Sequence, residues 1–198
     1  QVQRSQVNVG FAEPVSRAAR WELERLPGVK QAEVMRSIPV RLRVSNRSYR
    51  TALNGVADGS QLQRILDAQL RESRSLPGGV LLTTRLAERL GVAPGDEVHA
   101  ELLEGERIKA PLRVSGTVRE LAGMNAWMRL EDLNRLARES AMVSSAGLLV
   151  DRADEARLLE RLKQVPAAAV VIVNRTLVDT FRETSARNGL FVTAVLSA

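Results

Sequence analysis

The sequence contains no cysteine and a single histidine, His99. Without cysteine the chain forms no disulfide, offers no thiol nucleophile and cannot build a cysteine zinc site. A single histidine also excludes any metal site or catalytic device that takes two histidines from the same chain. Metal sites made of carboxylates alone and acid–base pairs remain possible.

Aromatic residues are also scarce, at 3% of the 198 residues, so Leu, Val and Ala must fill most interior positions. Apolar residues make up 44% of the chain, which is enough for a packed core in one medium domain or two small ones. Long apolar runs are missing too. The uncharged segment 189–198 has about half the roughly 20 residues that a membrane-spanning helix needs. It fits either a final buried segment or the start of a transmembrane helix.

Positive charge is unevenly distributed along the chain. Lys and Arg total 29 against 23 Asp and Glu, a net charge of +6. Residues 1–50 hold 10 basic and 4 acidic residues, whereas residues 51–198 hold 19 of each. The whole basic excess therefore lies in the first quarter of the chain. Arginine outnumbers lysine 26 to 3, but the arginines are spread along the chain, which is typical of a compositional bias.

Hydrophobic periodicity predicts an α+β protein. Val40, Leu42 and Val44 alternate with Arg41 and Arg43, which indicates a strand with one buried and one basic face. Pro14 suits the first turn of a helix over 15–26, and a second helix is expected over 61–70. Residues 78–98 predict a short strand, a two-turn helix closed by a left-handed Gly91, and a tight turn. Further expected elements are strands at 97–104, 107–120, 147–150 and 168–173, and helices at 130–136 and 154–164.

Several short motifs follow one another in a definite order. They are LPGV (26–29), IPVRLRV (38–44), NGV (54–56), GGVLLTTRLAERLGVAPGDEV (78–98), VSGTVRE (114–120), GMNAWM (123–128) and LLVD (148–151). This ordered set resembles the extracytoplasmic domain of FtsX-like, MacB-type ABC transporter permeases. The blocks cover residues from about 14 to 185.

The resemblance implies a fold in two parts. A discontinuous α/β porter-like subdomain, nearest the membrane, would be built from both chain ends, residues 1–56 and 146–198. A β-rich subdomain, residues 57–145, would be inserted into it and project outward. Both chain ends would then lie close together and leave from one face.

The resemblance also implies the function of a periplasmic or extracellular domain in an inner (cytoplasmic) membrane permease. The domain would relay ATP-driven motion and contact cargo (lipid, lipoprotein, peptide or drug) or a partner protein. Its partners would be the transmembrane helices of the permease and a separate cytoplasmic ATPase. It would have no enzymatic activity and no cofactor.

A cluster of arginines is the first candidate surface, and it consists of Arg36, Arg41, Arg43, Arg47 and Arg50. Such a cluster suits anionic lipid head groups, each basic side chain contributing roughly 1 kcal/mol near a membrane. It also fits a partner protein, or an ordinary exposed strand face. A stand-alone nucleic-acid-binding module is the alternative function. Tyr49 is the only aromatic residue beside these arginines, which argues against nucleic acid.

Met124, Trp127 and Met128 form the second candidate, either a contact for cargo or a partner, or a plug into the core. His99 and Asp96 are expected to be structural, Asp96 because it follows Pro-Gly in a turn. Four glutamates are expected to be solvated rather than to bind a metal, because they lack calcium-loop spacing: Glu97, Glu101, Glu104 and Glu106.

Overall fold

The fold comes from a computed structural model, which describes residues 4–61, 78–119, 123–165 and 167–174. The elements of its first part are β1 (Arg4–Ser16), α1 (Ala19–Glu24), β2 (Val29–Val44), β3 (Arg47–Val56), β4 (Val80–Thr83) and α3 (Thr84–Leu90). Those that follow are β5 (Glu97–Leu102), β6 (Lys109–Val118), β7 (Ala126–Arg129), α4 (Leu130–Leu136), β8 (Met142–Asp151), α5 (Glu155–Leu162) and β9 (Ala168–Asn174). The chain is thus a strand-rich mixture of α and β, as predicted.

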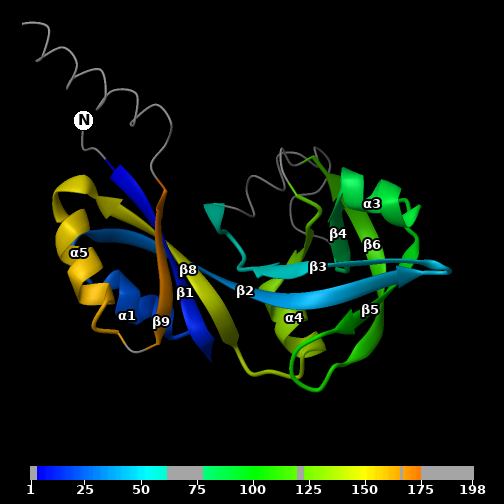
Figure 1. Ribbon diagram of the computed structural model, residues 1–198, viewed down its shortest axis with the longest axis horizontal. Coiled ribbons are helices and arrows are strands. Elements are labelled where there is room, and N and C mark those ends of the chain that lie inside the picture. Colours follow the sequence, from blue (N-terminus) through cyan, green and yellow to red (C-terminus); the bar gives the residue numbers. More distant parts are fainter. Residues whose placement is uncertain (1–3, 62–77, 120–122, 166, 175–198) are drawn as a thin grey trace, which may run out of the picture.

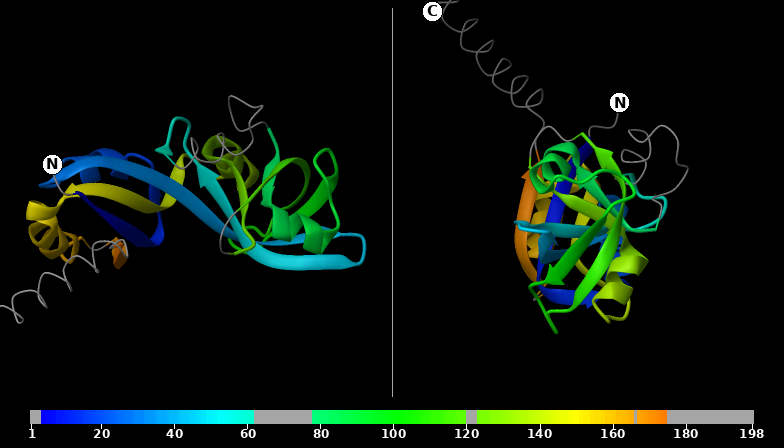
Figure 2. Two further views of the ribbon diagram at one scale, coloured as in Figure 1. Left: turned by 90° about the horizontal axis from the view of Figure 1, so that it is seen from above. Right: turned by 90° about the vertical axis from the view of Figure 1, so that its right-hand side faces the viewer.

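Strand β2 is the longest of the described elements and runs through both lobes of the molecule (Figure 2). Its even-numbered residues are buried from Ala32 to Leu42, as expected for a strand with one face against a core. Its first half pairs with β8, up to Met35, and its second half pairs with β5 from Val40. One continuous strand therefore belongs to two hydrophobic cores.

The second half of β2 belongs to a closed barrel of six strands. The strands are hydrogen bonded in the order β2, β3, β7, β4, β6 and β5, and β5 pairs with β2 to complete the ring. Helices α3 and α4 contribute Leu86, Leu90 and Leu133 to the same core. A barrel of this size is filled by side chains. We call the barrel with α3 and α4 the barrel lobe (Figure 1).

The first half of β2 belongs to a second lobe, built from both ends of the described chain. Its sheet has the order β2, β8, β1 and β9, with α1 and α5 on one face (Figure 1). Leu23 of α1 and Leu158 and Leu162 of α5 are buried among apolar residues of the sheet. We call this unit, made of β1, α1, β2 up to Met35, β8, α5 and β9, the end lobe.

Helix α4 joins the two cores. Leu130 is buried with the end-lobe core and Leu133 with the barrel core, although they are one turn apart. The helix packs closely on β3 at Gly55, where an added Cβ would lie 2.9 Å from Leu133 Cδ2 and 3.1 Å from Leu130 Cα. The lobes therefore meet through packed side chains as well as through β2.

The lobes divide the chain differently from the predicted boundary at residue 56. Leu53 of β3 and residues Ile38 to Leu42 of β2 are buried in the barrel core, not with the chain ends. The prediction followed the order of the chain, whereas barrel closure requires β3 to pair with β2 and β7. We therefore propose residue 36 as the first boundary and keep β8 as the return to the end lobe.

Most local predictions agree with the structure, except that β7 at Ala126–Arg129 was not expected and that the chain differs near Pro14. Gly91 ends α3 with φ +71°, the predicted left-handed cap. Pro14 lies in β1, which continues to Ser16 through an irregularity between Gly10 and Val15, and α1 begins only at Ala19.

The predicted helix over 61–70 and the apolar segment 189–198 lie outside the described residues. No helix in the described part has the length and apolar character needed to cross a membrane.

Candidate functional site

Arg36 does not lie on an exposed basic surface, because its side chain is only 1% exposed. It lies in β2 between the residues that pair with β8 and those that pair with β5. Its position has the same parity as the buried Val34 and Ile38, a signal that the alternation pattern already contained. Arg36 is therefore removed from the predicted surface.

Two glutamates from other parts of the chain neutralise Arg36. Its Nε donates to Glu139 Oε2 at 2.9 Å, and its Nη2 donates to Glu139 Oε1 and Glu104 Oε1, each at 2.7 Å. Burial alone would lower the pKa of Arg36, but the hydrogen bonds and negative charges of the two carboxylates outweigh it and raise the pKa. The guanidinium thus stays charged at the junction of the lobes.

This cluster ties three segments together. Glu104 follows β5, Glu139 follows α4, and Arg36 lies in β2. Arg36 Nη1 also donates to the Ser37 carbonyl at 3.1 Å, and Ser37 N donates to Ser144 Oγ of β8 at 2.9 Å. Glu104 and Glu139 are 68 and 103 residues from Arg36, so spacing in the sequence gave no sign of this arrangement.

Arg41, Arg43 and Arg50 share the outer face of the barrel, as strand alternation predicted for the first two. Arg41 is the register partner of Arg50 across β2 and β3, and its Nη1 donates to Glu101 Oε2 at 3.0 Å. Arg47 faces another way, because its guanidinium packs against Gly91 at the end of α3. The barrel therefore groups three of the five predicted arginines.

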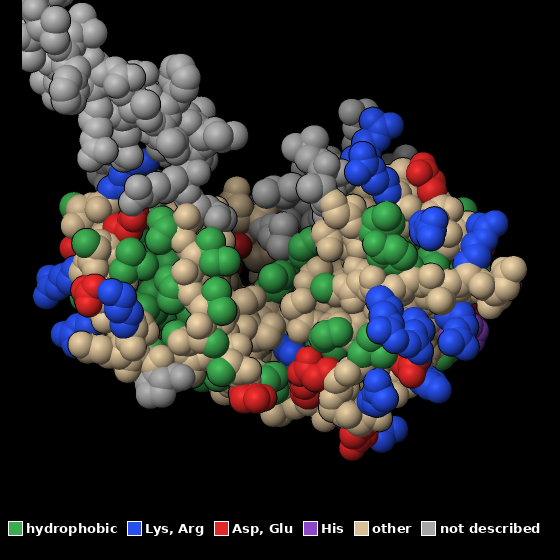
Figure 3. All heavy atoms as spheres, in the orientation of Figure 1, with side chains coloured by type: hydrophobic (Ala, Val, Ile, Leu, Met, Phe, Trp, Pro, Cys, Tyr) green, Lys and Arg blue, Asp and Glu red, His purple; other side chains and the backbone are tan. Residues whose placement is uncertain are grey.

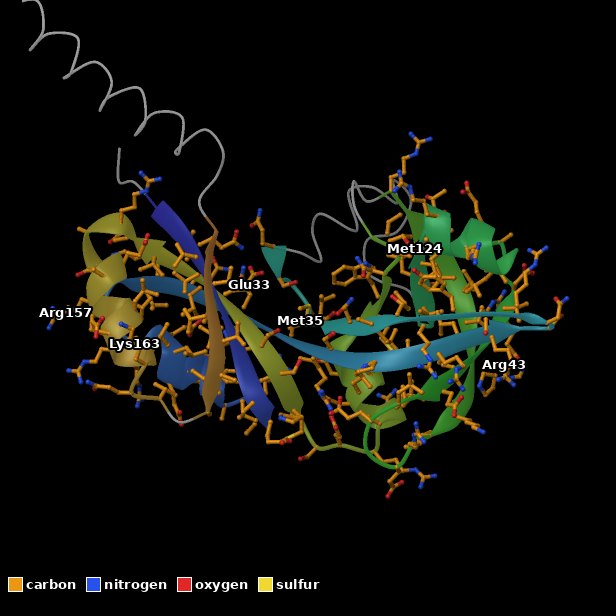
Figure 4. All side chains as sticks on the ribbon, viewed as in Figure 1. Glu33, Met35, Arg43, Met124, Arg157 and Lys163 are labelled. Carbon is orange, nitrogen blue, oxygen red and sulfur yellow. The ribbon has the colours of Figure 1, made fainter. Side chains whose placement is uncertain are left out.

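Met124, Trp127 and Met128 do not form an exposed loop. Trp127 and Met128 lie in β7 and are 9% and 4% exposed, and Met124 packs against the barrel core (Figure 4). The alternative interpretation, a plug into the core, is the one that agrees with the structure. Met128 and Met124 thus pack in the barrel core, whereas Trp127 packs in a separate cluster with Val56, Leu81 and Val118.

The polar candidates form no metal centre within the described residues. Asp96 Oδ2 accepts a hydrogen bond from Ala93 N at 2.8 Å, which closes the predicted turn. His99 lies exposed on β5, with Nε2 at 3.6 Å from Glu97 Oε1. No group of three described His, Asp or Glu side chains converges to hold a metal ion.

A groove lies on the face of the end-lobe sheet opposite α1 and α5. Its volume is about 400 Å³, and its lining includes Asn8, Glu33, Met35 and Ser145. Figure 4 shows Glu33 and Met35 near the junction of the lobes, and Figure 3 shows the surface hollowed there. Glu33 Oε1 accepts hydrogen bonds from Gln31 Nε2 at 2.9 Å and Gln61 N at 2.8 Å. The lining of the groove is thus more apolar than polar, with the hydrogen-bonded Glu33 carboxylate beside Met35.

The two ends of the described chain leave the end lobe side by side. Gln6 near the start of β1 is the register partner of Asn174 at the end of β9. Because the strands are antiparallel, both ends leave at the same end of the strand pair. This is the arrangement that the sequence resemblance predicted.

Comparison with known proteins identifies the fold. The chain is similar to a solved structure of the periplasmic region of MacB from Actinobacillus actinomycetemcomitans. The structural alignment covers 92% of this chain and 92% of the MacB chain, with a TM-score of 0.55 and 15% sequence identity. The chain has a MacB-type periplasmic fold. A second structure with this fold is the extracellular domain of YknZ, an ABC-type transporter from Gram-positive bacteria. The TM-score is 0.52 and the identity 15%, with 87% of this chain and 100% of that domain covered.

The likeness is one of structure rather than of close sequence. No family model matches the chain, and no curated protein is significantly similar in sequence. The MacB-type fold nevertheless extends over both lobes, since the alignment includes nearly the whole chain. Both matched structures are extracytoplasmic domains of transporters, in agreement with the resemblance found in the ordered motifs.

Proposed function

We propose that this chain is the extracytoplasmic domain of an ABC transporter permease, and that it relays ATP-driven motion and contacts cargo or a partner protein. The observation that carries the proposal is the pairing of Gln6 with Asn174, which brings both ends of the described chain out of one lobe. A domain inserted between two transmembrane helices needs this geometry. The MacB-type fold supports the same conclusion.

In this proposal the end lobe is membrane-proximal and the barrel lobe projects outward. The partners are the transmembrane helices of the same permease and a separate cytoplasmic ATPase. Cargo of the lipid, lipoprotein, peptide or drug class would meet exposed surfaces such as the groove beside Met35, since Trp127 and Met128 are buried. No enzymatic step is assigned to the domain.

The nucleic-acid alternative loses support in the structure. The basic excess of residues 1–50 suggested it, but Arg36 is neutralised internally and Arg41 is paired with Glu101. Arg17 and Arg20 are paired with Glu131 and Glu24. These four arginines, all within the basic first 50 residues, are thus paired with carboxylates, which leaves fewer cations available to a phosphate backbone.

Labelling of an engineered cysteine in the full-length protein tests the proposal. Ser48 is exposed beside the β2–β3 turn, and the chain has no cysteine of its own, so Ser48→Cys adds one thiol to this domain. We expect a membrane-impermeant maleimide to label it in intact cells as fully as in lysed cells. Full-length protein without the substitution gives the background. Labelling that requires lysis would contradict an extracytoplasmic position.

A further inference from the structure

Four strands of the barrel carry a basic outer face, which we define as Arg41, Arg43, Arg50, His99, Lys109 and Arg113. Register places these side chains together: Arg41 is opposite Arg50 and Glu101, and Glu101 is opposite Lys109. In the next row Arg43 is opposite His99. Direct partners in antiparallel strands point to the same side of the sheet. Residues near 109–113, far from the first 50 in sequence, thus extend the predicted surface.

The charges on this face are only partly neutralised. Within the described part of the chain, Arg41 has an ion pair with Glu101, whereas Arg43, Arg50, Lys109 and Arg113 have none. Arg41 and Arg50 are also direct cross-strand neighbours of like charge, an arrangement that disfavours the folded state. An anionic ligand between these rows would remove that repulsion. Figure 3 shows basic side chains gathered on this part of the barrel lobe.

The face is not a uniform positive field. Glu97 and Glu101 lie within it, and Glu97 is the register partner of Arg113. A phosphate backbone or an anionic bilayer would bring evenly spread negative charge against both carboxylates. A protein segment can place its own carboxylates beside the cations and leave the positions opposite Glu97 and Glu101 uncharged. Patterned charge therefore favours a protein partner.

A shallow pocket on the face has the size for side-chain recognition. It is about 190 Å³ in volume and is lined by Arg43, His99, Lys109 and Pro111, among others. Guanidinium groups bind carboxylates through two parallel hydrogen bonds, which selects Asp or Glu at such a position. The face lies on the barrel lobe, away from the end lobe, which holds both ends of the described chain (Figures 1 and 2).

We infer that the basic outer face of the barrel binds an acidic segment of a partner protein. Carboxylates of the partner lie between Arg41 and Arg50 and in the pocket beside Arg43 and Lys109. The further statement that this partner approaches from the side away from the bilayer rests on the proposed function. The binding itself depends only on the face, so it can be tested without the membrane.

The test uses the 198-residue chain and a fluorescent peptide of alternating Glu and Ser, with binding followed by anisotropy at low and at physiological salt. The variant Arg43→Glu/Arg50→Glu/Lys109→Glu removes three unpaired cations of the face. A matched control, Arg25→Glu/Arg157→Glu/Arg161→Glu, changes net charge equally at exposed positions of the end lobe. We expect the first variant to weaken binding by about tenfold or more and the control by about twofold or less.

Further arms separate the proposal from its competitors. Equal losses in both variants would show a general effect of net charge and would overturn the inference. So would the absence of peptide binding by the unmodified chain. Duplex DNA and phosphatidylglycerol vesicles are the comparison probes, and tighter binding of either through the same three residues would overturn the assignment to a protein partner. The single variant Arg50→Glu should unfold no earlier than the parent chain, because it places opposite charges where two arginines now face each other, and this keeps the binding result interpretable.

Discussion

Replacing Arg36 by methionine should destabilise the protein by about 3 kcal/mol. Breaking a buried ion pair by removing one partner typically costs about 3–5 kcal/mol, because the other charge stays uncompensated. Here the remaining carboxylates are not fully buried, since the side chains of Glu104 and Glu139 are 38% and 26% exposed. Water can therefore solvate part of the charge that Arg36 leaves behind, which places the expected loss at the low end of the range.

The single carboxylate variants should rank by exposure and by number of hydrogen bonds. Glu139 accepts two hydrogen bonds from Arg36 and Glu104 accepts one. A hydrogen bond to a charged group contributes about 1.5–3 kcal/mol. Because Gln keeps one acceptor oxygen and both sites are partly exposed, Glu139→Gln should lose about 3 kcal/mol and Glu104→Gln about 1.5 kcal/mol. The triple variant Arg36→Met/Glu104→Gln/Glu139→Gln should lie within about 1 kcal/mol of the parent chain, because no unpaired charge remains.

Urea unfolding followed by circular dichroism measures these differences, with Arg89→Met, an exposed arginine of α3, as the control. The control should change the free energy of unfolding by less than about 0.5 kcal/mol. The reasoning fails if Arg36→Met loses less than about 1 kcal/mol. It fails equally if the triple variant is as unstable as the sum of the single variants, since the coupling between the three groups would then be absent.

Three further predictions concern packing and the sheet edge. Gly55→Ala should destabilise by about 1–3 kcal/mol in urea unfolding, because its Cβ would press on α4, whereas Gly59→Ala, with no atom within 4 Å, should lose only the strain of its positive φ. Met128→Ala should lose about 2–4 kcal/mol through a core cavity without changing binding of the acidic peptide; a selective loss of binding would argue for a surface role. Ile172→Lys, at a side chain 55% exposed on β9, should leave the melting temperature nearly unchanged and reduce self-association in light scattering, and a large drop in stability would contradict its exposed position.

Local elements of this fold could be predicted because their signals are short-range. Alternation gave the buried face of β2 around Val40 and Leu42, and the glycine after a short apolar helix gave the cap at Gly91. Pro14 was misassigned, since a proline suits an irregular strand as well as the first turn of a helix. The order of the short motifs alone indicated the fold, and the structural likeness to MacB supports that prediction.

The barrel and the charge network could not be predicted, because both depend on pairings distant in the chain. Nothing near Arg36 indicates that Glu104 and Glu139 will surround it. Counting charge by position in the chain likewise placed the basic excess in one quarter of the sequence. In the folded protein that charge is divided among the interior, the end lobe and the barrel, and Lys109 joins it from elsewhere.

The pairing of Gln6 with Asn174 also decides how the end lobe responds to mechanical load. A load that pulls the start of β1 away from the end of β9 acts across the hydrogen bonds between these strands and breaks them one at a time. A load that displaces both exits together along the strands moves β1 and β9 as a pair and acts in shear on the hydrogen bonds between β1 and β8, all at once. The lobe is therefore compliant to splaying and stiff to axial displacement, and β2 passes an axial displacement directly into the barrel.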